Sequence, residues 1–258
     1  MVLVLPLFVA YQVGILFSGG VRNGADFVTD TLLLAIRTLM SLPTGAPSEP
    51  AQGDVLLAYL GVNLLVGLLL LAVVWHFRRR GRFSSKLFPL LLLESSVYAI
   101  FFSTVVALMM RVFGLDGLLR ASFEVYASLL STPALAAPAL AAGVTDLSLI
   151  DRVVMSIGAG LYEELVFRLF LMGGLFHLFS RTLSLPKIGA ALLALLLSSL
   201  VFSGVHHLGN MGEVFSLGAF TYRFFAGLLL AVIFHVRGFA VAVYTHALYD
   251  VLVLVLRG

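Results

Sequence analysis

Long apolar runs are the feature of this sequence that most restricts its fold. Several of them approach or exceed the roughly 20 residues that a helix needs to cross a bilayer core. The hydrocarbon contains no water, so each crossing segment must satisfy its own backbone hydrogen bonds, as a helix does. The chain has 258 residues, of which 61% are hydrophobic and 11% are charged, and one soluble core could not bury so much apolar surface. We therefore expect an all-α fold, a polytopic membrane helical bundle.

About seven membrane-spanning helices are predicted, and six to eight is the range that the apolar runs allow. They cover residues 1–19, 55–77, 88–112, 157–179, 189–208, 215–236 and 239–256. Two other stretches, 27–42 and 115–150, are expected to lie in the membrane interface or, for the second, to form a re-entrant loop. We expect one integrated membrane domain, with spans and interfacial segments in residues 1–150 and most of the intramembrane ionisable groups in residues 151–258.

The basic residues predict how the chain sits in the membrane. They mark three loops between spans and are Arg78, Arg79, Arg80, Arg82, Lys86, Arg181, Lys187 and Arg237. Alternating spans put these loops on one side, which the positive-inside rule makes cytoplasmic. We therefore predict a multi-pass protein of the cell (plasma or inner) membrane. Nucleic acid is not expected as a partner, because the basic residues flank spans and form no soluble basic face.

Ionisable side chains inside membrane spans are costly and therefore indicate function. The first group contains Glu163, Glu164 and Arg168. Glu164 and Arg168 are four residues apart with the acid first, the favourable order for an ion pair on a helix. Glu163 is rotated by about 100° from Glu164, so it stays available as a general base. The structural alternative is a polar network of all three residues that only holds helices together.

Two further groups lie on later apolar runs. Phe202 and His206 share one helix face, and a neutral histidine can position or deprotonate a water. His246 and Asp250 also share a face, so the carboxylate can orient the imidazole by accepting from one ring nitrogen. The structural alternatives are a solvated, inert histidine at the interface and a hydrogen bond within one helix.

The three groups in this order resemble the CAAX-protease and bacteriocin-processing family of intramembrane endopeptidases, also called the abortive-infection family. The pattern of that family is Glu-Glu-x-x-x-Arg, then Phe-x-x-x-His, then His-x-x-x-Asn/Asp, and this chain carries it from Glu163 to Asp250. The resemblance covers residues 150–256 and implies that residues 151–258 form a catalytic core. It also implies no cofactor, because the best-understood eukaryotic branch is independent of metal.

The same resemblance implies a role for each residue. Glu163 and His206 activate a water for attack on a peptide carbonyl, and His246 and residue 250 stabilise the oxyanion. An ionised Asp250 has no proton to donate, so we expect it to orient His246 instead.

Supporting roles fall to Glu164, Arg168 and Phe202, which hold the site together. The predicted topology places Glu163 and His206 in the outer half of the bilayer. The expected partner is therefore a membrane-associated or exported polypeptide, for example one with a C-terminal sorting or processing segment.

Other classes of function remain open from the sequence. A zinc-dependent intramembrane protease would use His206, His246 and carboxylates, although no His-Glu-x-x-His helix is present. A serine protease built on Ser203 lacks the Gly-x-Ser-x-Gly elbow. A non-catalytic immunity or scaffolding protein of the same family and a transporter are the non-enzymatic readings. The chain contains no cysteine, which excludes thiol nucleophiles and thiolate metal sites.

Overall fold

Every regular element in the described part of the chain is a helix. The computed structural model describes residues 2–15, 17–18, 87–118, 148–208 and 215–256, with isolated helical positions between 61 and 71. No strand occurs among these residues, which confirms the all-α prediction. Most of the predicted span 55–77 and all of the segment 27–42 lie outside the described residues, as does most of 115–150. The count of about seven spans stays a prediction.

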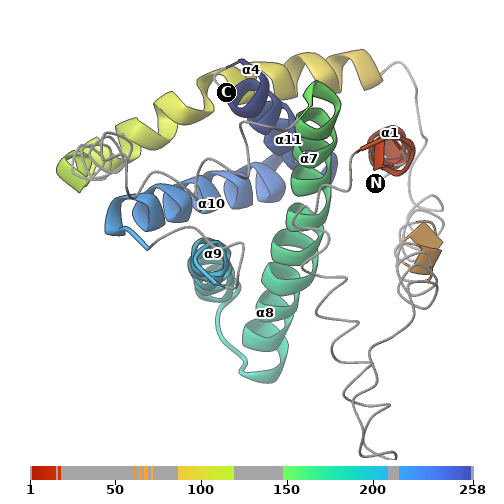
Figure 1. Ribbon diagram of the computed structural model, residues 1–258. Coiled ribbons are helices and arrows are strands. Elements are labelled where there is room, and N and C mark those ends of the chain that lie inside the picture. The colour runs from red at the N-terminus through yellow and green to blue at the C-terminus, as the bar shows by residue number, and fades with distance from the viewer. Residues whose placement is uncertain are drawn as a thin grey trace, which may run out of the picture.

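The helices are arranged around the last helix of the chain (Figure 1). In chain order they are η1 (Val2–Val4), α1 (Leu5–Ile15), α4 (Leu87–Val112), α7 (Leu149–Glu163), the π-helix η2 (Glu164–Met172), α8 (Gly173–His177), the π-helix η3 (Leu178–Thr182), α9 (Lys187–Val205), α10 (Leu217–Arg237) and α11 (Phe239–Leu256). Figure 1 shows α7 and α8 in one continuous line, with α9 seen almost end-on beside α8. The helices therefore cross one another steeply and do not form a parallel bundle.

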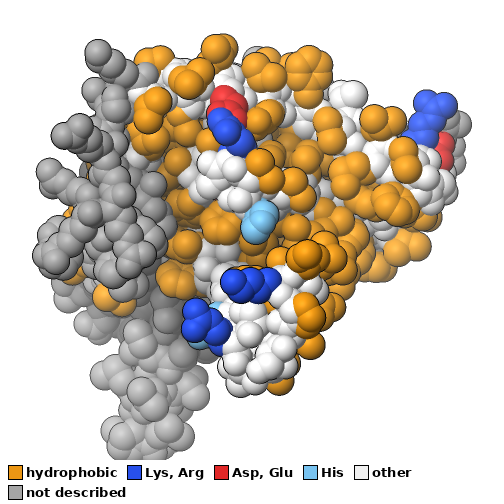
Figure 2. Space-filling model, turned by 180° about the vertical axis from the view of Figure 1, so that it is seen from behind, with side chains coloured by type: hydrophobic (Ala, Val, Ile, Leu, Met, Phe, Trp, Pro, Cys, Tyr) orange, Lys and Arg blue, Asp and Glu red, His pale blue; other side chains and the backbone are white. Residues whose placement is uncertain are grey.

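Three of the described helices are long and apolar enough to cross a membrane by length and composition: α4, α9 and α10. Their surfaces support this reading, because large apolar side chains point outward along α4 and α9. Leu93 and Ile100 of α4 and Ile188 of α9 are more than 60% exposed, and hydrophobic side chains cover much of the face in Figure 2. A soluble monomer rarely exposes so large an apolar patch, whereas lipid tails would cover it.

The central helix is α11, and it packs against α4, α7 and α10. All residues from Phe239 to Ala247 are buried. The hydroxyl of Ser95 on α4 donates to the carbonyl of Val241 at 3.5 Å, and Arg152 on α7 donates to the carbonyl of Leu254 at 3.1 Å. The start of α7 thus lies beside the end of α11, so these two helices run in opposite directions.

The closest approach in the fold lies between α7 and α11 at Gly160. A Cβ atom added at Gly160 would lie 2.5 Å from the backbone nitrogen of Ala247 and 2.7 Å from its Cα. No side chain fits there, so the two backbones pack directly on each other. A glycine at such a position permits close approach of two helices. The contact brings Glu163 and Glu164 against His246, which neighbours Ala247.

From α4 onward the predicted span boundaries agree with the described helices, with one exception. The spans 88–112, 189–208, 215–236 and 239–256 fall within a few residues of α4, α9, α10 and α11. The prediction that a span begins at residue 157 was wrong, because the helix begins at Leu149 and continues through π-helical turns to Thr182. A capping box starts it early, since Ser148 and Asp151 each accept from the other's backbone N–H. Glu163 therefore lies about two turns further from the helix start than predicted.

We predict that Gly160→Ala lowers the thermal unfolding midpoint of the detergent-solubilised protein. The added methyl group has no space against the Ala247 backbone, and such overpacking typically costs roughly 1–3 kcal/mol. Gly174→Ala on α8 is the matched control, because nothing lies within 4 Å of its Cβ position. Equal midpoints for the two variants would contradict the direct contact of α7 with α11.

Candidate active site

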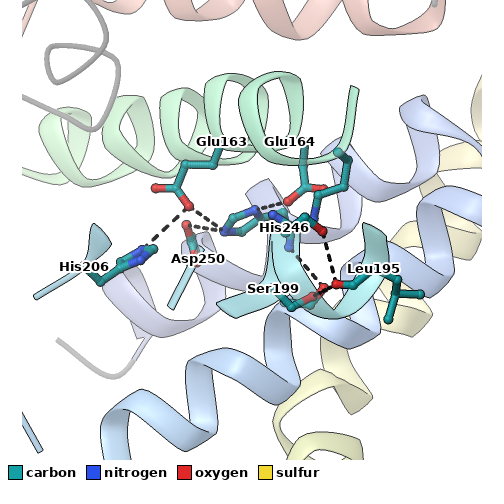
Figure 3. Close-up of polar contacts among 10 residues, drawn as sticks. Glu163, Glu164, Leu195, Ser199, His206, His246 and Asp250 are labelled. Atoms are coloured by element: carbon teal, nitrogen blue, oxygen red, sulfur yellow. Dashed lines mark hydrogen bonds and ion pairs between the residues drawn. The ribbon is translucent and has the colours of Figure 1, made fainter. Parts of the chain in front are cut away.

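Seven residues singled out in the sequence come together where three helical segments meet. Glu163, Glu164 and Arg168 come from the junction of α7 and η2, Phe202 and His206 from the end of α9, and His246 and Asp250 from the middle of α11. Figure 3 shows the carboxylate of Glu163 pointing at both histidines, with Asp250 beside His246. Residues up to 87 positions apart, such as Glu163 and Asp250, thus form one polar cluster inside an apolar fold.

The carboxylate of Glu164 is the buried centre of this cluster. Its Oε1 lies 2.9 Å from Nδ1 of His246, and its Oε2 lies 3.2 Å from Nε of Arg168. Its side chain is fully buried, so an ionised carboxylate here depends on these two partners. The sequence indicated the pair with Arg168, whereas the hydrogen bond to His246 connects elements far apart in sequence and was missed.

Arg168 is held on several sides and is 1% exposed. Its Nη2 donates to the carbonyl of Gly227 on α10 at 3.3 Å, and its guanidinium lies 4.4 Å from the centre of the Phe202 ring. A Cβ at Gly227 would lie 3.1 Å from the Phe202 ring and 3.2 Å from Cβ of Ser199. The glycine therefore allows α9 and α10 to approach closely around the guanidinium. These contacts suit a residue that stabilises the site and does not meet substrate.

Glu163 faces away from this ion pair and toward both histidines. Its Oε2 lies 3.7 Å from Nε2 of His206 and 3.8 Å from Nε2 of His246. Both distances exceed a direct hydrogen bond, and separations of this length are commonly bridged by a water. With 17% of its side chain exposed, Glu163 is also accessible, in contrast to Glu164.

The ring of His206 is fixed by its own helix. Nδ1 lies 2.7 Å from the carbonyl of Phe202, one turn earlier. A carbonyl oxygen only accepts hydrogen bonds, so Nδ1 carries the proton and donates it. In the neutral ring Nε2 then has a free lone pair, and it is this atom that faces Glu163.

Asp250 approaches His246 from the other side of the ring. Its Oδ2 lies 3.5 Å from Nε2 of His246, while Nδ1 of the same ring binds Glu164 at 2.9 Å. The shorter contact fixes the ring, so Glu164 orients His246 more directly than Asp250 does. The two carboxylates thus hold opposite nitrogens of one imidazole.

The cluster sits at an irregular point of the helix. The π-helix η2 starts at Glu164, directly after the last α-helical residue, Glu163. π-helical turns are rare and are frequently found at functional sites. Such wider turns were not predicted, because no sequence signal separates them from ordinary helix.

Ser203 does not take part in the cluster. Its side chain is fully buried, and its hydroxyl donates to the carbonyl of Phe220 on α10 at 2.6 Å. The hydroxyl proton is therefore used to join α9 to α10, which gives no support to Ser203 as a nucleophile.

Comparison with known families decides the relationship that this geometry suggests. Residues 145–252 match the model of a family described as Type II CAAX prenyl endopeptidase Rce1-like. This part of the chain is therefore similar to the Rce1-like family. The matched segment contains all seven residues of the cluster, from Glu163 to Asp250. Rce1-like proteins are proteases, and with its apolar, outward-facing helices the chain is a membrane protein. Searches of curated proteins and of solved structures return no match.

Arg168→Ala should lower the yield and thermal stability of the protein as well as its activity. Removing one partner of a buried ion pair typically costs about 3–5 kcal/mol, because Glu164 keeps its charge without compensation. Thermal unfolding in detergent measures the effect, with exposed Arg181→Ala as the control. Full stability with loss of turnover alone would instead make Arg168 a residue that acts on substrate.

Proposed function

We propose that the protein is a glutamate-type intramembrane endopeptidase that hydrolyses a peptide bond with a water activated by Glu163 and His206. One observation carries the proposal: Oε2 of Glu163 lies 3.7 Å and 3.8 Å from the Nε2 atoms of two histidines. A water between these atoms would donate one hydrogen to the carboxylate and the other to the Nε2 lone pair of His206. The match of residues 145–252 to a family of proteases supports the same conclusion.

The reaction then follows the usual course of water-mediated hydrolysis. Glu163 takes a proton from the water as general base, and the water oxygen forms a bond to the carbonyl carbon of the scissile peptide. The electron pair of the C=O double bond moves to oxygen and gives a tetrahedral oxyanion. When the C–N bond breaks, that pair returns to the carbonyl, and the leaving nitrogen receives the proton from Glu163. His246 lies beside Glu163, and Glu164 holds its ring in place.

The substrate and its location follow from sequence-based predictions. We propose a multi-pass protein of the cell membrane whose residues 151–258 form the catalytic core behind N-terminal spans in residues 1–150. Its partner is a membrane-associated or exported polypeptide, for example one with a C-terminal sorting or processing segment. The predicted cytoplasmic placement of Arg181, Lys187 and Arg237 supports an outward-facing site. Nucleic acid plays no part in this proposal.

A zinc-dependent protease is the second candidate, and one observation favours it. Oxygen and nitrogen atoms of Glu163, His206, His246 and Asp250 converge through separations of 3.5–3.8 Å, and all are possible zinc ligands. Against this, the described residues contain no group of three His, Asp or Glu side chains arranged to hold a metal. A non-catalytic immunity or scaffolding role is the further alternative, and it requires that membranes containing the protein show no cleavage.

Glu163→Gln and His206→Ala should each abolish proteolysis while the protein still inserts and accumulates. Both variants remove an atom that meets the attacking water, and loss of a general base typically costs roughly 10²–10⁴-fold in rate. A proteomic comparison of membranes with wild-type and Glu163→Gln protein detects the uncleaved precursor and shows whether it is an exported polypeptide. His177→Gln, at an exposed position on α8, is the control. Near-wild-type cleavage by either site variant would remove the water-activation mechanism.

Treatment with a membrane-permeant zinc chelator should leave cleavage intact. The reason is that Glu163 and His206 activate water in this proposal without a metal. The measurement is cleavage of the accumulated precursor by purified protein before and after chelation, with add-back of zinc. Activity that disappears on chelation and returns with zinc would establish the second candidate.

A further inference from the structure

The cluster contains few hydrogen-bond donors for the oxyanion that the proposed reaction creates. An ionised Asp250 only accepts hydrogen bonds. Nδ1 of His206 donates to Phe202, and Nε2 of His206 faces the carboxylate that activates the water. His246 binds Glu164 through Nδ1 and turns Nε2 toward two more carboxylates. Three carboxylates in one site also disfavour the further negative charge of an oxyanion.

Arg168 does not supply the positive charge that would stabilise the oxyanion, although it is the nearest cation to Glu164. It is 1% exposed, and its guanidinium is enclosed by the Phe202 ring and the carbonyl of Gly227. A substrate carbonyl would have to displace these contacts to reach it. Stabilisation of the oxyanion therefore needs a group on the less buried side of the site, where His206 and Asp250 lie.

The helical register of α10 brings Arg223 to that side. Ala231 packs against Ala194 and Met172, and Gly227 packs against Phe202 and Ser199. Arg223 lies one turn before Gly227 on the same face, so it belongs to the face of α10 that meets α9.

α9 and α10 cross at this face, where Gly227 of α10 meets Ser199 and Phe202 of α9. Ser203 of α9 meets Phe220 of α10, whereas Ser199, one turn earlier on α9, meets Gly227, which is later on α10. His206 follows Phe202 by one turn toward the end of α9. Arg223 precedes Gly227 by one turn on α10, so His206 and Arg223 each lie about one turn from the point where the two helices cross.

Electrostatics agree with this placement. Arg223 is near enough for its positive charge to act on both His206 at the end of α9 and Asp250 on α11. Arg223 is half-buried, and a long arginine side chain can place its guanidinium well away from its own helix.

The hydroxyl groups next to Asp250 point elsewhere. Tyr249 packs on the Phe102 ring of α4 and accepts a hydrogen bond from Ser103 at 3.2 Å. The hydroxyl of Tyr222 lies 3.0 Å from that of Tyr249. Both phenols thus belong to the interface with α4, on the other side of α11 from Gly160 and Glu163.

We propose that Arg223 stabilises the oxyanion of the tetrahedral intermediate, an assignment that rests on the proposed function. The guanidinium donates N–H bonds to the carbonyl oxygen as the C=O electron pair moves onto it, and it releases that oxygen when the C–N bond breaks. No proton or electron leaves Arg223 in this step. Because the interaction is strongest with the charged intermediate, it lowers the barrier more than it tightens substrate binding.

The test is the split between kcat and KM for Arg223 variants in detergent. The probe is the precursor that accumulates in Glu163→Gln membranes, alongside a prenylated CAAX peptide with an internal quencher. Arg223→Gln should lower kcat on the order of 10²–10³-fold with KM little changed, and Arg223→Lys should lose less because it keeps the charge. Arg181→Gln is the control and should match wild type. Wild-type kcat in Arg223→Gln, or a change confined to KM, would overturn the assignment.

Double variants at Asp250 separate a donor from a simple counter-charge. In the Arg223→Gln background, Asp250→Asn adds an N–H donor, whereas Asp250→Leu has a similar shape and removes the negative charge without a donor. We expect Asp250→Asn to raise the kcat of the Arg223→Gln variant and Asp250→Leu to leave it unchanged. An equal rise in kcat with both substitutions would overturn the assignment, because it would show that Arg223 only compensates the negative charge of Asp250.

Two controls keep this result distinct from the proposed function. Cleavage by wild type but not by Glu163→Gln tests the proposed function by itself and does not depend on Arg223. Thermal unfolding of each variant shows that it is folded. If Arg223→Gln does not fold, Arg223→Lys gives the same comparison, and an unchanged kcat in that variant would overturn the assignment.

Discussion

The arrangement of the site depends on one buried carboxylate. Glu164 contacts Arg168 within its own helix and His246 on α11, and Arg168 in turn binds the carbonyl of Gly227 on α10. One ionised group thereby connects three helices in an apolar interior, where each contact is stronger than it would be in water. The same setting makes loss of any partner costly. The position of His246 is therefore coupled to the folded state of the whole helical core.

Two adjacent glutamates divide the tasks of structure and chemistry in this arrangement. The rotation of about 100° between neighbouring helical residues sends Glu164 into the core and Glu163 toward the histidines. Glu164 is fully buried with two close partners, whereas Glu163 is partly exposed and has no direct hydrogen bond among the described residues. A partly exposed carboxylate without a direct hydrogen bond suits a base, and a buried carboxylate with two close partners suits a scaffold.

The sequence allowed much of this site to be predicted, because its main signals are local. The spacing of Glu164 and Arg168 predicted their ion pair, and the separation of Phe202 from His206 predicted a shared helix face. Contacts between distant helices could not be predicted from spacing. Only the fold shows that Glu164 binds His246 and that Arg168 reaches Gly227.

Helix boundaries were harder to predict than the ion pair and the shared helix face. The apolar run suggested that a span begins at residue 157, and the helix actually begins at Leu149 because the capping box of Ser148 and Asp151 is a polar signal outside that run. The π-helical turns after Glu163 have no local signature of this kind.

The backbone contact at Gly160 has a further consequence for access to the site. A seam too narrow for a single methyl group is also too narrow for an extended peptide or a lipid chain. Substrate cannot reach Glu163 between α7 and α11, so this pair of helices forms the closed back wall of the site. Any opening must lie on another side, and the least buried polar groups of the cluster are His206 on α9 and Asp250 on α11. Gly160 thus restricts the directions from which a polypeptide substrate can approach Glu163.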